Sequence, residues 1–262
     1  MAAIEVVGLR KSFGEREAVR GISFRIEPGE VVAFLGPNGA GKSTTLRILT
    51  GQLARDGGEV RVLGLDPAAQ SLEIRKRISF LPDQPPLYDA LSVREQLELV
   101  AGVRGLDDAT AGARVPALME ALGITELADV PLAACSRGNR QRAALAAAFV
   151  EAPELVLMDE PMFGLDAATV LLVKEVLRRL SESGVAVFYS SHLLDVAESV
   201  ATRVVILDRG EIVADGPPEK LLRERAADGA KRSLEQLFRE LTADRDVEER
   251  AERFLTAARL RP

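Results

Sequence analysis

Residues 36–43 read Gly36-Pro37-Asn38-Gly39-Ala40-Gly41-Lys42-Ser43. This stretch fits G-x-x-x-x-G-K-[ST], the pattern of a loop that wraps the phosphates of a nucleotide. Glycines let the backbone approach the phosphate oxygens closely and point successive N–H groups at them. In such a loop the lysine reaches the β- and γ-phosphates, and the hydroxyl after it binds Mg²⁺. We therefore predict that Ser43 binds the metal and that the nucleotide contacts come from Gly36, Pro37, Asn38, Gly39, Ala40, Gly41, Lys42, Ser43 and Thr44.

The segments on both sides of this loop have the structure that the pattern requires. Residues 31–35 are an uninterrupted apolar run, which is typical of a buried strand. Residues 43–49 have the period of a helix with Leu46 and Leu49 turned inward, and the N-terminus of that helix adds a positive dipole end. The alternative is a chance match in a glycine-rich turn, which would not carry this strand–loop–helix context.

Composition and charge narrow the class of protein. The chain has 262 residues, of which 47% are hydrophobic and 28% charged, as in an ordinary globular protein. A net charge of −6 argues against general nucleic-acid binding, which needs a basic face. Cys135 is the single cysteine, so no disulfide framework is expected and a reducing compartment fits. No signal peptide and no bilayer-spanning apolar run are expected, so any work at a membrane would go through partners.

The rest of the chain has an α/β pattern. Two expected strands, 4–9 and 18–26, are joined by a turn at Gly14, and further strands are expected at 58–64, 78–81, 155–158, 185–190, 204–207 and 211–213. Helices are expected at 72–77, 167–183 and 193–200. Strands that alternate with helices indicate a mostly parallel sheet, which binds ligands at the carboxyl ends of its strands.

Two further regions are helical in period. Residues 84–152 hold expected helices at 92–102, 109–122 and 139–151, with Ser92 as an N-cap and Glu95 completing a capping box. We interpret this region as a helical subdomain inserted in the α/β core. Residues 217–262 are charged and helical, and we expect their apolar stripes to pack on the core or on a second copy of the chain. The stripes are Leu234, Leu237, Phe238 and Leu241, then Val247, Ala251, Phe254, Leu255 and Ala258.

An acidic pair follows the expected strand at 155–158. Neighbouring residues at the end of a strand can leave it in different directions, so Asp159 and Glu160 can do different work. We predict that Asp159 holds Mg²⁺, directly or through water, and that Glu160 orients the water that attacks the γ-phosphate. The alternative is a pair of solvated acids at a strand end.

Two residues with ring side chains, His192 and Phe13, are further candidates for the same site. His192 is the only histidine and follows an expected strand on the ligand side of the sheet, where a neutral imidazole could donate to a γ-phosphate oxygen. Phe13 lies in a polar context and could stack on an adenine face. The alternatives are a surface histidine and a half-buried phenylalanine at a strand end.

Residues 136–141 lie just before residues 142–151, which belong to the helix expected at 139–151. Ser136 and Gly138 at a helix N-terminus can bind an anion through backbone N–H groups and the helix dipole. Because the chain already has a complete phosphate loop, a second anion site needs a second phosphate. A head-to-tail dimer, with each Ser136 segment closing over the other copy's nucleotide, would supply one. The alternative is a plain N-cap.

Taken together, these motifs resemble those of the ATP-binding subunits of ABC transporters, in order and spacing over residues 1–220. Residues 36–43 match the Walker A motif, 155–160 Walker B with its glutamate, 136–141 the signature motif, 164–166 the D-loop, His192 the switch histidine and Phe13 the adenine-stacking aromatic. Residues 81–105 and 233–238 resemble the branch that serves ABC-2-type exporters.

The chain departs from the family pattern at two places. The signature reads Cys135-Ser136-Arg137-Gly138-Asn139, where the family usually has Leu-Ser-Gly-Gly-Gln, but the phosphate-facing serine and second glycine are kept. Where the family has the glutamine of the Q-loop, which is associated with the metal, this chain has Asp83 followed by Gln84. Either residue can take that role.

The resemblance implies an α/β fold with a P-loop NTPase (RecA-like) core, an N-terminal antiparallel β subdomain and the inserted α-helical subdomain. The ATP-binding domain would span residues 1–220, with the helical subdomain at about 84–152, and residues 221–262 would form a helical extension. ATP and Mg²⁺ are the implied ligands. Binding of ATP would close a homodimer or heterodimer of ATP-binding subunits, and hydrolysis would open it.

The same resemblance implies export through separate membrane-spanning permease subunits, which would dock near residues 83–88. It places the protein peripherally at the cytoplasmic face of the inner membrane and gives it no nucleic-acid partner. One alternative is a non-transport ATPase of the same fold that acts on ribosomes or DNA, although those branches usually carry two cassettes or coiled-coil insertions. A P-loop kinase for a small metabolite is a second alternative, and it would leave the Ser136 segment unexplained.

Overall fold

The computed structural model describes residues 1–224, 233–242 and 253–258. A six-stranded sheet forms the centre of the molecule, with the strand order β5-β6-β7-β3-β8-β9. Its strands are β3 (Val31–Leu35), β5 (Ile78–Leu81), β6 (Leu155–Asp159), β7 (Ala186–Ser191), β8 (Arg203–Asp208) and β9 (Glu211–Gly216). The first five are parallel, and β9 pairs with β8 in the antiparallel sense. Every residue of β3, β6 and β7 is buried, as expected for strands covered on both faces.

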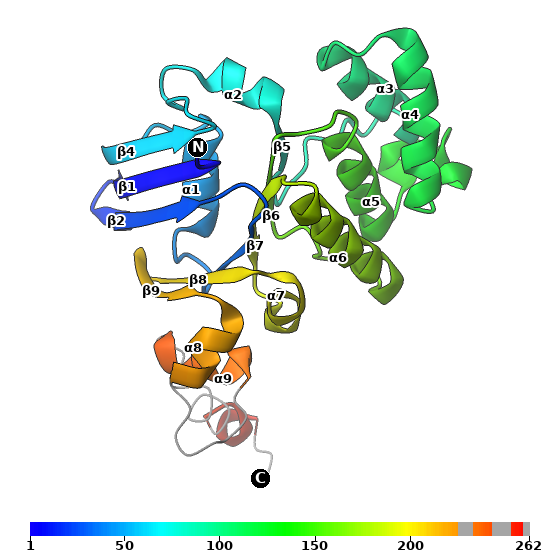
Figure 1. Ribbon diagram of the computed structural model, residues 1–262. Helices are drawn as coiled ribbons and strands as arrows, with labels where there is room; N and C mark the ends of the chain where they lie inside the picture. Colours follow the sequence, from blue (N-terminus) through cyan, green and yellow to red (C-terminus); the bar gives the residue numbers. More distant parts are fainter. Residues whose placement is uncertain (225–232, 243–252, 259–262) are drawn as a thin grey trace.

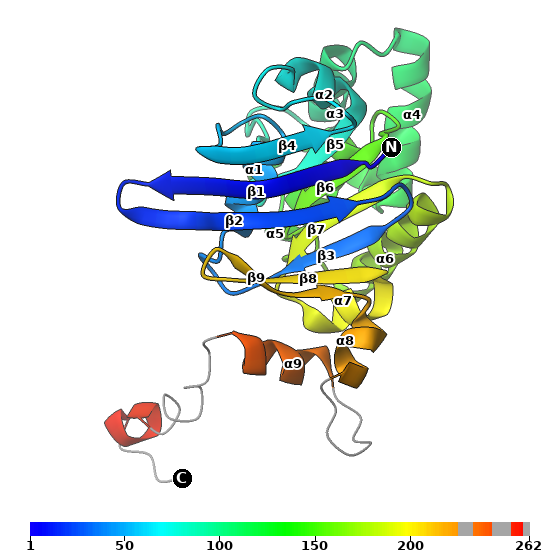
Figure 2. The same cartoon turned by 60° about the vertical axis from the view of Figure 1, so that its left-hand side comes forward.

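A smaller antiparallel sheet lies over one face of the central sheet (Figure 1, Figure 2). It has the order β2-β1-β4 and consists of β1 (Ile4–Phe13), β2 (Arg16–Ile26) and β4 (Gly57–Val62). One core joins this sheet, helix α1 (Lys42–Leu49) and the facing side of the central sheet. Its aromatic centre is Phe24, Phe34 and Phe188, with ring centroids 5.0–6.0 Å apart. This packing holds β3 and α1, which flank the phosphate loop, in a rigid frame.

A second core lies on the other face of the central sheet. Helices contribute to it from α5 (Arg137–Ala148), α6 (Ala167–Glu182), α7 (Leu194–Val200), α8 (Pro218–Glu224) and α9 (Leu234–Leu241). The first C-terminal stripe forms α9, whose Leu234 and Leu237 are buried, as the sequence predicts. Of the second stripe, Val247 and Ala251 lie outside the described residues. Phe254 is 69% exposed, so this part of the stripe does not pack on the core of its own chain.

Helices α3 (Val93–Val103) and α4 (Asp108–Ala121) pack with α5 around a third core (green in Figure 1). Ser92 and Glu95 form the predicted capping box at the start of α3. Helix α5 belongs to two cores at once, because Ala144 and Leu145 face the central sheet whereas Ala143 and Ala146 face α3 and α4. Burial on both sides fixes the position of the α5 N-terminus. The remaining short helices are α2 (Ser71–Arg77), η1 (Thr125–Leu127) and η2 (Leu132–Ala134).

Several element boundaries differ from the prediction. Strand β1 continues to Phe13, because its outer half pairs with β2 across a turn that has Gly14 at φ +59°. Helix α5 begins at Arg137, ahead of the predicted starts at 139 and 142, because the Ser136 side chain caps it by accepting a hydrogen bond from the Asn139 N–H. The N-cap that the sequence left as an alternative is therefore present.

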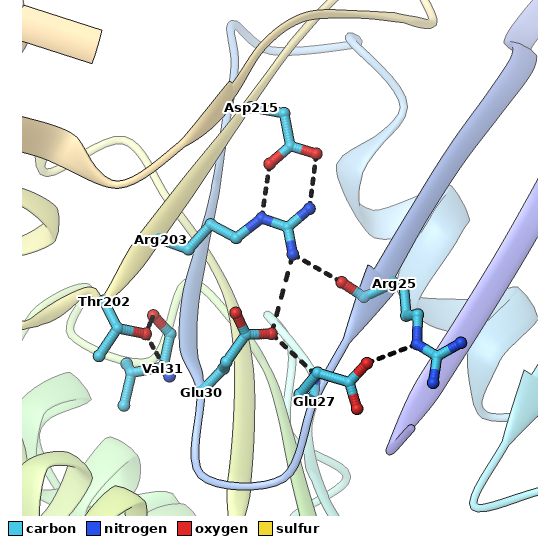
Figure 3. A network of polar contacts seen from close by, with 7 residues as sticks. All are labelled: Arg25, Glu27, Glu30, Val31, Thr202, Arg203 and Asp215. Carbon is cyan, nitrogen blue, oxygen red and sulfur yellow. Dashed lines mark hydrogen bonds and ion pairs between the residues drawn. The ribbon is translucent and has the colours of Figure 1, made fainter. Parts of the chain in front are cut away.

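A polar network at the amino-terminal end of β3 joins the two sheets (Figure 3). The Arg203 guanidinium binds both carboxylate oxygens of Asp215 at 2.6 and 2.7 Å and donates to the backbone oxygen of Arg25 at 2.8 Å. The Thr202 hydroxyl accepts from the Val31 N–H and donates to the Val31 carbonyl. The network therefore ties β2 to β8 and β9 at the edge of the sheet opposite the phosphate loop.

Candidate nucleotide-binding site

A cavity of about 890 Å³ lies at the carboxyl ends of the central strands. Its lining includes all nine predicted phosphate-loop residues together with Phe13, Asp83, Asp159, Glu160 and His192. These residues come from five separate segments of the chain. The structure thus brings most of the predicted site together. Three predicted site residues, Gln84, Ser136 and Gly138, do not line this cavity in the described chain.

The geometry of the phosphate loop requires glycine at two positions. A Cβ on Gly36 would lie 2.3 Å from the backbone oxygen of Leu207. Gly41 has φ +112°, and a Cβ there would lie 2.5 Å from the backbone oxygen of Ala18. Side chains at these positions would collide with fixed backbone atoms, so the loop can approach a ligand closely only with glycines here.

Lys42 begins α1, and its side chain is buried against the loop. Its Nζ donates to the carbonyl oxygens of Gly36 at 2.6 Å and Pro37 at 3.3 Å. Burial lowers the pKa of Lys42, while the charges of Glu160 and Asp159 raise the pKa and partly oppose the effect of burial. The ammonium group is therefore held inside the cavity, where it would meet the phosphates.

Asp159 and Glu160 leave β6 in different directions, as predicted. Asp159 is 4% exposed, and its Oδ1 accepts a hydrogen bond from the Ser190 hydroxyl at 2.5 Å. Glu160 has φ +52°, a left-handed conformation that is uncommon for a residue with a side chain. Its N–H is held by the carbonyl and hydroxyl oxygens of Ser190 at 3.2 and 3.0 Å. The neighbouring strand β7 thus stabilises an unusual backbone turn, of the kind that is concentrated at functional sites.

His192 follows β7 and lies directly against Glu160. Its Nδ1 is 2.7 Å from Glu160 Oε2, and its backbone N–H donates to the same oxygen at 3.3 Å. The His192 side chain is 49% exposed, whereas that of Glu160 is 17% exposed. The two residues that we predict to be catalytic therefore form a pair at the mouth of the cavity.

A second cavity of about 340 Å³ lies beside the first. Asp83 and Glu160 line both cavities, whereas Gln84 lines only the second one, together with Pro85 and Leu87. Asp83, and not Gln84, therefore lines the cavity that the phosphate loop also lines.

Five residues of the main cavity were not predicted to belong to the site: Arg16, Ala18, Arg137, Phe163 and Phe238. Arg16 donates to the backbone oxygen of Gly39 at 3.1 Å and so contacts the phosphate loop directly. Phe238 had been assigned only to the apolar stripe of α9. Phe163 could have been noticed in the sequence as an aromatic residue three positions after Glu160.

A parallel sheet with a glycine loop, a buried lysine and an acidic pair converging on one cavity defines the class of P-loop nucleotide-hydrolysing proteins. Residues 19–163 match the family model described as ABC transporter, and the chain belongs to this family. It is an ATP-binding subunit that hydrolyses ATP to drive transport.

Individual proteins agree with this assignment. The chain is 37% identical over 221 residues to the Nod factor export ATP-binding protein I of Paraburkholderia xenovorans, covering 84% of this chain and 73% of that protein. It superposes on the structure of an ATP-binding subunit of an ABC transporter with a TM-score of 0.84 and 30% identity, covering 91% and 99% of the two chains. A dimeric ATP-binding cassette bound to ADP and Pi gives a TM-score of 0.75 at 26% identity, covering 82% and 98%.

Proposed function

We propose that this chain powers an exporter in which ATP closes a dimer of cassettes and separate subunits carry the cargo across the membrane. The observation that carries the proposal is the arrangement of the motifs. The phosphate loop, the acidic pair and His192 share one cavity, which Arg137 of the segment 136–138 also lines but Ser136 and Gly138 do not. The site is then incomplete until a second chain supplies its own Ser136 segment. The export function of the Paraburkholderia relative supports the direction of transport.

The cavity supports distinct roles for its residues. We assign Lys42 and the loop N–H groups to the β- and γ-phosphates, and Phe13, which is 52% exposed at the cavity edge, to stacking on adenine. Glu160 is the base that orients the attacking water. His192 Nδ1 lies 2.7 Å from Glu160 Oε2, so the other ring nitrogen, Nε2, is the one that we assign to contact with the γ-phosphate.

The donors in the cavity fit Mg²⁺. Ser43 offers a hydroxyl, while Asp159 and Asp83 offer carboxylates, and all three line the same space. Mg²⁺ prefers hard oxygen donors of this kind. It usually binds a few of them from the protein and completes its coordination with phosphate oxygens and water. We assign these three residues to the metal, with Asp83 in preference to Gln84 because Asp83 lines the main cavity and Gln84 does not. When bound, the metal would neutralise charge that develops on the phosphates.

We propose the following domain division. Residues 1–220 form the ATP-binding unit, with a helical subdomain at about 84–152, and residues 221–262 form an extension. The third core, between Val93 and Val150, supports the subdomain boundary. The extension is not independent in its described part, because Leu234 and Leu237 join the core behind the central sheet and the Leu234 N–H donates to Glu198.

A mixing experiment tests whether two copies share each site. Ser136→Asp keeps an equally good N-cap for α5 but places a negative charge where the partner's γ-phosphate would lie. Lys42→Met removes the lysine of the phosphate loop. We expect each variant alone to be nearly inactive. We expect an equimolar mixture to recover about a quarter of the parental ATPase rate, because half of the dimers are mixed and each mixed dimer has one intact site of two.

The mixture needs a control for simple dilution. Each variant is therefore assayed alone at the total concentration of the mixture. A second control, Ser136→Thr, keeps the helix cap and the hydroxyl and is expected to stay active. A mixture no more active than its components would contradict site sharing between identical copies.

The proposed partners are membrane-spanning subunits, which places the protein peripherally at the cytoplasmic face of the membrane. Among the residues that the structure describes, no helix combines the length and the apolar character that a bilayer crossing requires. Purification from native membranes in mild detergent is expected to recover the chain with at least one protein that has several transmembrane spans. Recovery with ribosomes and not with membranes would favour the non-transport alternative.

A further inference from the structure

Four side chains form a continuous row from the start of α5 to the acidic residue Glu160. The Arg137 guanidinium lies over the ring of Phe163, 4.0 Å from its centroid. The Phe163 ring meets the His192 ring edge-on, with the centroids 5.7 Å apart and an interplanar angle of 66°. The row ends at Glu160, 2.7 Å from His192 Nδ1. All four residues line the main cavity.

The backbones that carry this row are packed directly together. A Cβ on Gly138 would lie 3.1 Å from the backbone oxygen of Gly164, so the first turn of α5 touches the loop that follows Glu160. One turn further along α5, the Gln141 amide donates to the Pro161 carbonyl at 3.0 Å, and Arg142 pairs with Asp166. The start of α5 and the 161–166 loop are therefore held as one unit.

Phe163 has no other evident reason to be aromatic. It is 41% exposed and belongs to none of the three cores among the described residues. Its ring has the cation of Arg137 over its face and a T-shaped contact with the imidazole of His192. Since half of the His192 side chain is exposed, the edge contact restricts a ring that is otherwise held mainly by Glu160.

We propose that Phe163 is a positioning residue for ATP hydrolysis, holding His192 against Glu160, and that Arg137 in turn holds Phe163. Arg137 is carried by the Ser136 segment, which faces the partner's nucleotide in the dimer of the proposed function, on which this inference rests. Movement of that segment when the partner's nucleotide binds would then pass through Phe163 to the catalytic pair of the same chain. The two sites of the dimer would be coupled through this row.

The kinetic test compares two replacements of Phe163 in the full chain. Phe163→Leu keeps an apolar side chain but removes the aromatic face and edge, and Phe163→Tyr restores them. We expect Phe163→Leu to lower kcat about tenfold while the KM for ATP changes less than about twofold, because misplaced catalytic groups slow the reaction more than they weaken binding. Phe163→Tyr is expected to keep kcat within about twofold of the parent.

Phe254→Leu, a matched change at an exposed phenylalanine outside the site, is the control and is expected to leave both constants unchanged. The proposal is overturned if Phe163→Leu has the parental kcat, or if Phe163→Tyr is as slow as Phe163→Leu.

A spectroscopic test does not depend on turnover. Because His192 is the only histidine, an untagged protein gives a single set of imidazole signals in an NMR spectrum. Removing the Phe163 ring current should shift the His192 ring-proton signals in the nucleotide-free protein, and Arg137→Gln should shift them less. Unchanged His192 signals in Phe163→Leu would overturn the positioning role. The NMR measurement does not depend on whether Glu160 is the general base. The positioning role of Phe163 and the proposed function can therefore be contradicted independently of each other.

A double-mutant cycle tests the link between Arg137 and Phe163. If Arg137 acts only through the Phe163 ring, Arg137→Gln will lower kcat in the parent and have no further effect in Phe163→Leu. Independent, multiplicative losses of kcat would overturn the link. Thermal melting of each variant confirms that the comparison is made between folded proteins.

Discussion

Replacing Glu160 with glutamine is expected to lower the rate of ATP hydrolysis by about 10²- to 10⁴-fold, the usual contribution of a general base. Glutamine has nearly the same shape but cannot accept the proton of the attacking water. The phosphate loop, Lys42 and Phe13 are untouched, so ATP should bind as in the parent. Removing a negative charge beside the triphosphate should also favour the closed dimer, which then has no way to open through hydrolysis.

Three measurements distinguish these effects. Phosphate release gives the rate, a fluorescent ATP analogue gives the affinity, and analytical ultracentrifugation with ATP is expected to show a dimer that persists in Glu160→Gln. Glu120→Gln on the exposed side of α4 is the matched control and should behave as the parent. If Glu160→Gln hydrolyses ATP at the parental rate, Glu160 is not the base.

Replacing Lys42 with methionine should remove nucleotide binding itself. Methionine fills most of the buried volume of the lysine stem, so the fold should persist. The loss of the ammonium group leaves the phosphates without their one buried cation in the loop, and we expect ATP affinity to fall by about 10²-fold or more. Isothermal titration calorimetry measures this loss directly.

Thermal unfolding gives an independent measure of the same change. A ligand that binds only the folded state stabilises it by an amount that grows with the logarithm of the ligand concentration relative to its Kd. The parent should therefore melt at a higher temperature with ATP than without it. Lys42→Met should melt near the ATP-free parent under both conditions, whereas Lys76→Met, at an exposed position on α2, should keep the ATP-dependent rise. A retained rise in Lys42→Met would contradict the assignment of Lys42.

Features that depend on a few consecutive residues were predictable from the sequence. The Ser92 capping box is formed by the side chains of its own residues. The phosphate loop and the turn at Gly14 have backbone conformations that glycine favours because it has no side chain. The apolar runs before the loop and before Asp159 are typical of buried strands, and the carboxyl ends of such strands lie at the ligand side of a parallel sheet. These local rules placed the phosphate loop, Asp159, Glu160 and His192 in one site.

Features that depend on contacts across the chain were not predictable. Strand β7 lies between β6 and β3, although all three are far apart in sequence, and this order brings Ser190 against Asp159 and His192 against Glu160. The start of α5 was placed too late, because its cap and an anion-binding loop have the same sequence pattern. Phe238 reaches the cavity because α9 folds back on the core.

The sequence by itself thus determined that the chain binds nucleotide phosphates and where the acids of that site lie along the chain, because backbone preference and hydrophobic periodicity act over short distances. Only the tertiary structure decided that Ser136 lies outside its own chain's cavity and that Arg137, Phe163 and His192 stack in a row. These contacts join segments tens of residues apart, and their geometry follows from how the helices and strands pack, which no local pattern encodes.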